Sequence, residues 1–139
     1  MPVNRHYLPD SSLSICVYSG VLDADTILRN LRDHVNDPLY RPTMAELADL
    51  SGVTRFDLEY ASLARVASGM TGLYTAPKTL SIFAPGDVAF GIGRMYAALC
   101  RQSGPLRAHV HRTEAEALAQ HRITDMSLSA ILAGCIRRD

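Results

Sequence analysis

Three strand-like apolar segments, each followed by a segment with helical periodicity, constrain the fold of this chain more than any other feature. The first, residues 44–53 with the sequence MAELADLSGV, reads as an interior strand that runs into a polar loop. The other two are residues 78–84 and 106–112. Strands that alternate with helices form parallel sheets with right-handed crossovers. The alternation therefore predicts an α/β fold.

An N-terminal hairpin is expected at one edge of this sheet. Residues 4–9 can form an edge strand, and a turn-forming cluster at 10–12 leads into residues 13–19, where side chains alternate with a period of two. Gly20 is expected to end the second strand. The complete prediction is a mixed β-sheet, with an edge antiparallel hairpin followed by parallel strands, together with about four helices.

Side chains that can accept a backbone hydrogen bond mark the expected helix starts. Asp23 or Asp25 can cap the first helix, and Asp57 the second. Thr113 and Glu116 fit a capping box at the start of a short fourth helix.

The spacing of apolar residues predicts which side of each helix is buried. In the first helix Asn30 falls among the side chains expected to face water, whereas in the third Val88 belongs to the expected buried stripe. The buried stripe expected for the second helix is Leu63, Val66, Ala67 and Met70.

The C-terminal segment is expected to be an addition to a complete domain. The chain has 139 residues, which suits one domain, and the core is expected to be complete over residues 1–122. Residues 123–139 are expected to form a helical extension, since residues 128, 131, 132 and 136 make an apolar stripe at helical spacing. Because such a stripe must be covered, we predict a homodimer with two-fold symmetry. The alternative is that the extension folds back onto its own sheet.

The composition argues against several classes of function. Lys plus Arg and Asp plus Glu each number 14, and a neutral protein lacks the positive field that bulk nucleic-acid binding needs. No apolar run approaches the roughly 20 residues of a membrane-spanning helix. The three cysteines have neither a pairing signature nor metal spacing, which is typical of reduced thiols in the cytoplasm. We therefore expect a cytoplasmic protein that uses no nucleic acid, membrane span, metal or cofactor.

The carboxyl end of the first interior strand supplies one candidate binding site. In open α/β sheets, ligands and partners meet the loops at the carboxyl ends of strands. Asp49 and Ser51 are expected in such a loop, and Asp57 at the start of the helix that follows. These three residues are therefore candidates for binding a partner or a ligand.

The third helix contains a second set of candidates, Gly91, Gly93 and Arg94. A glycine inside a helix costs ~1 kcal/mol relative to alanine, so each one requires a compensating reason. Two reasons stay open: a ligand or chain approaches the backbone closely, or the helix packs closely on the sheet. Arg94 can bind an anion or an acidic group of a partner, or it can form a structural salt bridge.

Three motifs, taken in order along the chain, match a known pattern. They are ADLSGV at 48–53, GIGRMY at 91–96 in the long helix, and a final strand with an acidic, alanine-rich helix at 107–119. Together they resemble the SpoIIAA-like branch of the STAS domain family, also described as STAS/SEC14-like. The resemblance covers roughly residues 5–122 and implies a STAS-type fold with a role in binding or regulation.

One segment departs from the pattern of that family. Its sigma-factor regulators carry a phosphorylatable serine in an Asp-Ser-Ser-Gly segment, whereas residues 57–60 here are Asp-Leu-Glu-Tyr. Phosphorylation at this position is therefore not expected to be the regulatory input.

The sequence shows no convincing nucleophile–base pair or metal-ligand set, so the chain is not expected to be an enzyme.

Two functions are expected from these observations. The first function is a binding or regulatory module that recognises a partner protein through residues 49–57 and the following helix. The second, implied by the SEC14-like resemblance, is a carrier of a small apolar or lipid-like ligand in a pocket lined by residues such as Phe83, Phe90 and Met95. An enclosed apolar pocket between the sheet and the helices, on the order of hundreds of Å³, would favour the carrier, and a solid core would favour the binding module.

Overall fold

A six-stranded mixed sheet lies at the centre of the fold. The computed structural model describes residues 2–102 and 104–138. In this part of the chain the strands are β1 (Val3–Leu8), β2 (Leu13–Asp23), β3 (Ala45–Asp57), β4 (Lys78–Phe83), β5 (Leu106–His111) and β6 (Ile136–Arg138). Their order across the sheet is β5-β4-β3-β2-β1-β6. β2, β3, β4 and β5 pair in parallel, whereas β1 runs antiparallel to both β2 and β6. The predicted α/β fold with a mixed sheet is therefore confirmed.

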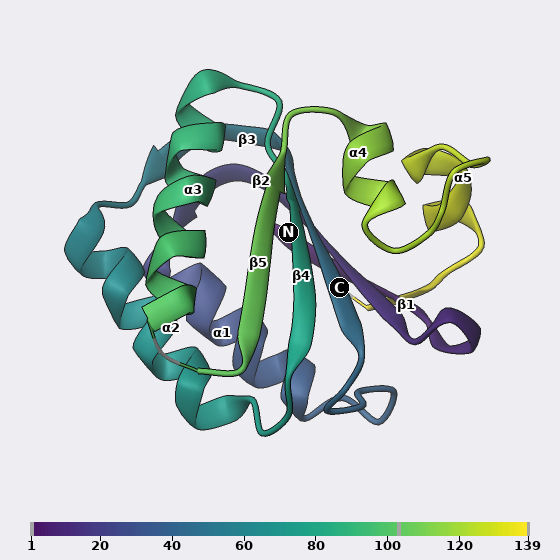
Figure 1. Cartoon of the computed structure of the whole chain (residues 1–139), viewed down its shortest axis with the longest axis horizontal. Coiled ribbons are helices and arrows are strands. Elements are labelled where there is room, and N and C mark those ends of the chain that lie inside the picture. The colour runs from purple at the N-terminus through teal and green to yellow at the C-terminus, as the bar shows by residue number, and fades with distance from the viewer. Residues whose placement is uncertain (1, 103, 139) are drawn as a thin grey trace.

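Helices cover both faces of the sheet, as Figure 1 shows. A 3-10 turn, η1 (Pro9–Ser11), connects the hairpin strands, and the α-helices of the described residues are α1 (Ala24–Val35), α2 (Tyr60–Leu73), α3 (Asp87–Gln102), α4 (Glu114–Ala119) and α5 (Leu128–Ala133). α1, α2 and α3 pack on one face of the sheet, and the two short helices α4 and α5 pack on the other. The arrangement is consistent with an α/β fold of the STAS type.

β2 and β3 are longer than expected. β2 continues past Gly20, and β3 continues through the segment that was expected to be a loop, so the two strands pair from Leu13↔Ala45 to Asp23↔Asp57. Register irregularities on either side of Gly20, which has a φ of 71°, accommodate the turn-forming residues within the ladder. The prediction of a polar loop was wrong, because pairing between two distant segments outweighs local turn propensity.

The two faces of α1 differ from the expected pattern at one position. The Asp23 side chain caps the helix by accepting a hydrogen bond from the Thr26 backbone N–H at 2.8 Å, as predicted. Asn30, however, is only 4% exposed. Its amide donates to the hydroxyl of Tyr18 at 3.0 Å and to Cys16 Sγ at 3.4 Å. A buried polar side chain is stable here because its partners lie on the adjacent strand.

Small residues place α3 close to the sheet. The buried residues of this helix are Ala89, Gly93, Ala97, Leu99 and Cys100. Val88 is 68% exposed, so its predicted burial was wrong. A Cβ at Gly93 would lie 3.0 Å from Val110 Cγ1, tighter than ordinary van der Waals contact. Close helix–sheet packing therefore explains Gly93.

The C-terminal segment completes the second face of the sheet. Leu128 and Ile131 of α5 are buried against Leu13, Ile15 and Leu47. The expected helix over 126–136 ends at residue 133, and the chain then adds β6 beside β1, which is therefore not an edge strand. The last residue of the predicted extension, 139, lies outside the described residues. Since the chain covers most of this stripe itself, the reason given for a homodimer is removed, and the homodimer stays a prediction.

Candidate functional site

The residues expected in a loop after the first interior strand lie on a strand instead. Asp49 is 6% exposed, and its Oδ1 accepts a hydrogen bond from the backbone N–H of Ser51 at 2.9 Å. Ser51 is exposed within β3, and Asp57 is the exposed last residue of that strand. Asp57 is not a helix cap: α2 begins after Glu59, whose backbone N–H donates to Ser62 Oγ at 2.8 Å. The three side chains do not form one site, and their role in binding stays a prediction.

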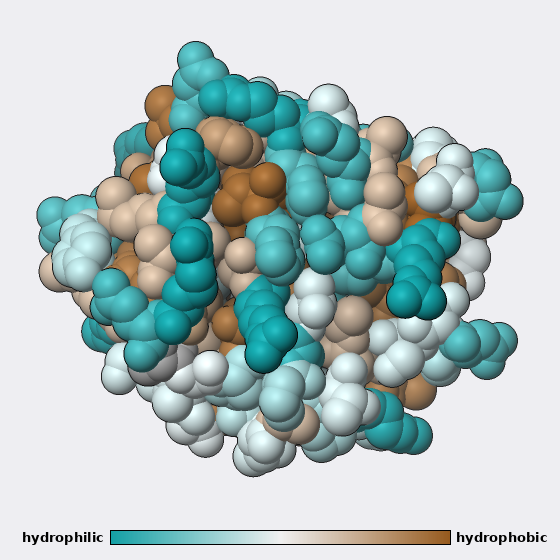
Figure 2. Space-filling view, viewed as in Figure 1, coloured by the Kyte–Doolittle hydropathy of each residue, from teal (hydrophilic) through white to brown (hydrophobic). Residues whose placement is uncertain are grey.

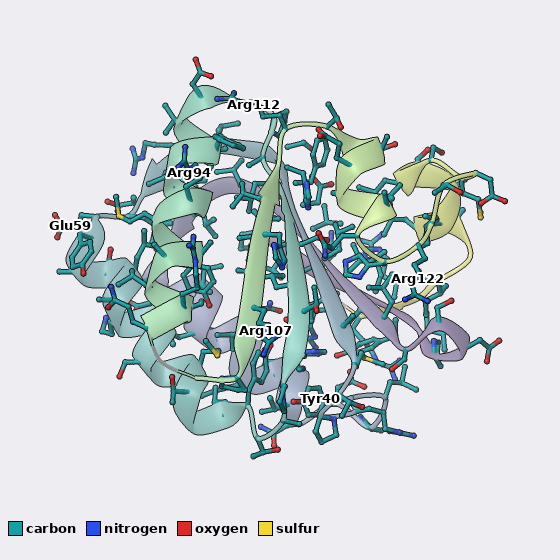
Figure 3. All side chains as sticks on the ribbon, viewed as in Figure 1. Tyr40, Glu59, Arg94, Arg107, Arg112 and Arg122 are labelled. Carbon is teal, nitrogen blue, oxygen red and sulfur yellow. The ribbon has the colours of Figure 1, made fainter. Side chains whose placement is uncertain are left out.

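The candidates on α3 separate into a packing residue and two exposed residues. Gly93 is explained by its contact with β5. Gly91 is exposed, and a Cβ added to it would meet nothing within 4 Å, so packing does not explain it. Arg94 is exposed one turn further along α3, beside the edge of the sheet, as Figure 3 shows.

A hollow of about 280 Å³ lies between α3 and β5. We call it the β5 groove, and its lining residues are Phe90, Arg94, Ala97, Arg101, Ala108, His109, Val110 and His111. Successive side chains of a strand point to opposite faces of the sheet, yet four consecutive residues of β5 line this hollow. The groove therefore lies over the outer edge of β5, where the sheet ends.

The β5 groove is cationic. Arg94 and Arg101 are both exposed, and none of the lining residues is acidic. In the described part of the chain no carboxylate forms an ion pair with either arginine, whereas nearby Arg112 binds Asp87 at 2.8 Å. In Figure 2, hydrophilic side chains over α3 and β5 flank a strip of apolar surface. An apolar floor between unpaired guanidinium groups is suited to an anionic group on an organic or peptide ligand.

A cluster of charged side chains is buried at the opposite end of the α1–α3 face, near the starts of β3 and β4. Glu46 Oε2 lies 2.9 Å from Lys78 Nζ and 3.3 Å from His34 Nε2. The Lys78 ammonium also lies over two aromatic rings, 4.6 Å from the centroid of Tyr40 and 4.0 Å from that of Tyr74. Cation–π contacts of this kind partly replace the water that the ammonium has lost.

The pKa of Glu46 shows that this cluster holds its carboxylate ionised. Burial by itself would raise the pKa, but the hydrogen bond from His34 and the charge of Lys78 keep it below the ordinary value of 4.5. Burial raises the pKa of the Cys16 thiol to about 12, and the negative charge of the Glu46 carboxylate contributes to this shift. Cys16 is therefore a protonated thiol and not a nucleophile.

Sequence reasoning missed this cluster, although two signals were present. Lys78 is the sole lysine of the chain and opens an apolar strand, and Glu46 interrupts the apolar segment MAELADL. A charged residue in a strand that is buried on both faces needs a buried partner. Neither signal identifies that partner, because the two residues are distant in sequence.

The interior cavity is too small for a lipid. It lies between the sheet and α1–α3, has a volume of about 80 Å³, and is bounded at its polar end by Asn30, His34 and Glu46. Ligand pockets are usually roughly 300–1,000 Å³. Phe83, Phe90 and Met95, the expected lining residues, do not line it.

The described residues show neither a metal-binding cluster nor a membrane-spanning helix. Among residues 2–102 and 104–138, no group of three or more His, Cys, Asp or Glu side chains is arranged to hold a metal ion. No helix in the described parts of the chain is both long and apolar enough to cross a membrane.

Comparison with known proteins does not assign the chain to a family. No protein-family model matches the sequence, and no curated protein matches it either.

Proposed function

We propose that this chain is a non-enzymatic binding module of the SpoIIAA-like (STAS) type, which recognises an acidic segment of a partner protein at the β5 groove. One observation carries the proposal: the open edge strand of the sheet lies beside exposed arginines that have no carboxylate partner among the described residues. The proposal gives this role to α3 and β5, and the binding role expected for residues 49–57 stays a prediction.

Strand addition is the binding mode that this geometry favours. The outer edge of β5 presents backbone N–H and C=O groups that no strand of the described chain pairs with. An extended peptide can satisfy these groups, while pockets along the edge select its side chains. The peptide would lie along the groove, between α3 and the end of the sheet.

Charge sets the expected chemistry of the peptide. Arg94 and Arg101 are about 10.5 Å apart along the helix axis, since an α-helix rises about 1.5 Å per residue. Alternate residues of an extended strand share a face and are about 6.6 Å apart. Acidic residues at alternate positions can therefore reach both guanidinium groups, each of which can bind a carboxylate through two hydrogen bonds.

The carrier function receives less support. A lipid-like ligand needs an enclosed apolar space, and the cavity of about 80 Å³ is well below the usual range for ligand pockets. A nearly filled core favours the binding module, as does the position of the cationic residues on the surface.

The test is binding of fluorescein-labelled octapeptides by fluorescence anisotropy. A peptide that alternates Glu with Val should bind, and its counterpart with Lys in place of Glu should not. Arg94→Ala/Arg101→Ala should weaken the binding at least tenfold. The matched control Arg29→Ala/Arg32→Ala removes the same charge from exposed positions of α1 and should leave the affinity unchanged.

No binding of the acidic peptide would contradict the proposal. Equal loss of binding in the α1 control variant, or tighter binding of a single-stranded oligonucleotide of the same charge, would contradict it as well. Amide chemical shifts measured on the complex locate the peptide, and changes confined to residues away from β5 would also contradict it.

A further inference from the structure

The turn after α4 contains a residue in a conformation that favours glycine. Arg122 has a φ of 62°. Its backbone N–H donates to the carbonyl of Ala119 at 2.9 Å, and the N–H of Ile123 donates to the carbonyl of Leu118 at 3.1 Å. This hydrogen-bond pattern is a Schellman motif, in which the left-handed position is usually glycine because a Cβ is strained there. The chain therefore holds an arginine where a glycine would fit the backbone better.

Arg122 borders a hollow of about 360 Å³ on the α4/α5 face of the sheet. Leu13, Ala45 and Ile123 give the hollow an apolar floor, and Thr79 adds a hydroxyl. None of its lining residues is acidic. Figure 3 shows Arg122 in the chain that follows α4, on this side of the sheet. The volume is within the range of ordinary ligand pockets, roughly 300–1,000 Å³.

A buried contact fixes the position of this turn. His121 Nε2 lies 2.6 Å from Oγ of Ser81, which is fully buried in β4. Burial lowers the pKa of His121, partly opposed by a hydrogen bond with the backbone of Glu46. The imidazole is therefore neutral at pH 7, so the positive charge at the hollow belongs to Arg122. The anchored histidine holds the next residue at the rim of the hollow.

We infer that this hollow binds a small organic carboxylate, whose apolar body lies on the floor and whose carboxylate pairs with Arg122. The positive charge comes from the Arg122 guanidinium, which has no carboxylate partner among the described residues. A single cation above an apolar floor suits a monocarboxylate better than a phosphate, which carries more charge and needs more donors. An arginine occupies this position although its φ of 62° carries a local backbone cost. This site is separate from the β5 groove and does not depend on it.

The test uses benzoate as the probe, with its neutral isostere benzamide and inorganic phosphate beside it. Binding is followed by amide chemical shifts of the full-length protein, and wild-type shifts should change around Thr79 and Arg122 with benzoate only. Arg122→Gly should weaken benzoate binding at least tenfold while raising Tm by about 3 °C, because glycine relieves the strain. Arg122→Lys keeps the charge and should retain binding within a few-fold.

In Arg122→Gly, a binding role predicts weaker benzoate binding together with a higher Tm, whereas a structural role of the side chain predicts a lower Tm. If Arg122→Gly lowers Tm, the arginine side chain supports the fold and the inference fails. Equal binding of benzamide, or tighter binding of phosphate, overturns the assignment to a carboxylate. Arg94→Ala/Arg101→Ala is the matched control, and loss of benzoate binding in that variant would place the anion in the β5 groove instead.

Discussion

Each face of the sheet places a histidine near a buried serine hydroxyl, but the two histidines have different surroundings. On the α1–α3 face, His34 Nε2 lies 3.5 Å from Ser14 Oγ and also contacts the carboxylate of Glu46. On the α4/α5 face, the partly buried His121 lies 2.6 Å from Ser81 Oγ, a neutral hydroxyl. One face thus contains a set of buried charges, and the other keeps its histidine neutral.

The difference follows from the lengths of the covering elements. Lys78, Glu46 and His34 come from β4, β3 and α1, and the long helices on this face exclude water from all three. A buried charge is tolerated only when such partners surround it. α4 and α5 have six residues each and shield a much smaller core. On that face the partly buried His121 contacts a neutral hydroxyl, that of Ser81.

The largest effect is expected from breaking the charged set. Glu46→Ala leaves the Lys78 ammonium buried without its carboxylate and should cost about 3–5 kcal/mol of unfolding free energy. Glu46→Leu/Lys78→Met removes both charges and should recover most of that loss, because two apolar groups need no partner. Urea titration measures both variants. A loss below about 1 kcal/mol for Glu46→Ala would show that water reaches Lys78, and the contrast between the faces would disappear.

Acid should weaken the two faces in different pH windows. The pKa of His121 is lowered from its ordinary 6.5, so the unfolded chain binds a proton more readily. Its contribution to stability is present above pH 6.5 and is lost as pH falls below that value through the folded pKa. The pKa of Glu46 is lowered from 4.5, so its contribution is lost only at pH below 4.5.

The pH windows can be separated with one variant. His121→Gln should flatten the dependence of the unfolding free energy on pH just below 6.5, measured by urea titration at a series of pH values. The control His109→Gln removes an exposed histidine of β5 instead. Equal flattening in both variants would mean that His121 is not the group responsible.

The smallest effect is expected at the start of α2, on the α1–α3 face of the sheet. Ser62→Ala removes the hydroxyl that accepts the Glu59 N–H and should cost about 1 kcal/mol. Asp57→Ala changes an exposed strand residue and should stay within about 0.5 kcal/mol. Thermal unfolding of the two variants ranks them, and the reverse order would restore Asp57 as the helix cap.

Local patterns were sufficient for much of the architecture. The period of two predicted the N-terminal hairpin, and the four-residue stripe of α2 is buried as predicted. The predicted cap at Thr113 is also present, with the Thr113 hydroxyl accepting the Glu116 N–H at 3.2 Å, but the Glu116 carboxylate accepts from that hydroxyl at 2.7 Å and the second bond of a capping box is not seen. These features depend on neighbours within one element, so a single segment contains the information.

Tertiary contacts decided the rest, because the partners come from distant segments. Parallel pairing with β2 keeps Asp49 and Ser51 in a strand, although both favour turns. Asn30 is buried because β2 provides its hydrogen-bond partners, and the position of Asn30 within α1 does not predict those partners. The charges of Arg94 and Arg101 could be read from the sequence, but only the sheet order places them beside an open edge. A residue's type is local, whereas its burial and its partners depend on which segments the fold brings together.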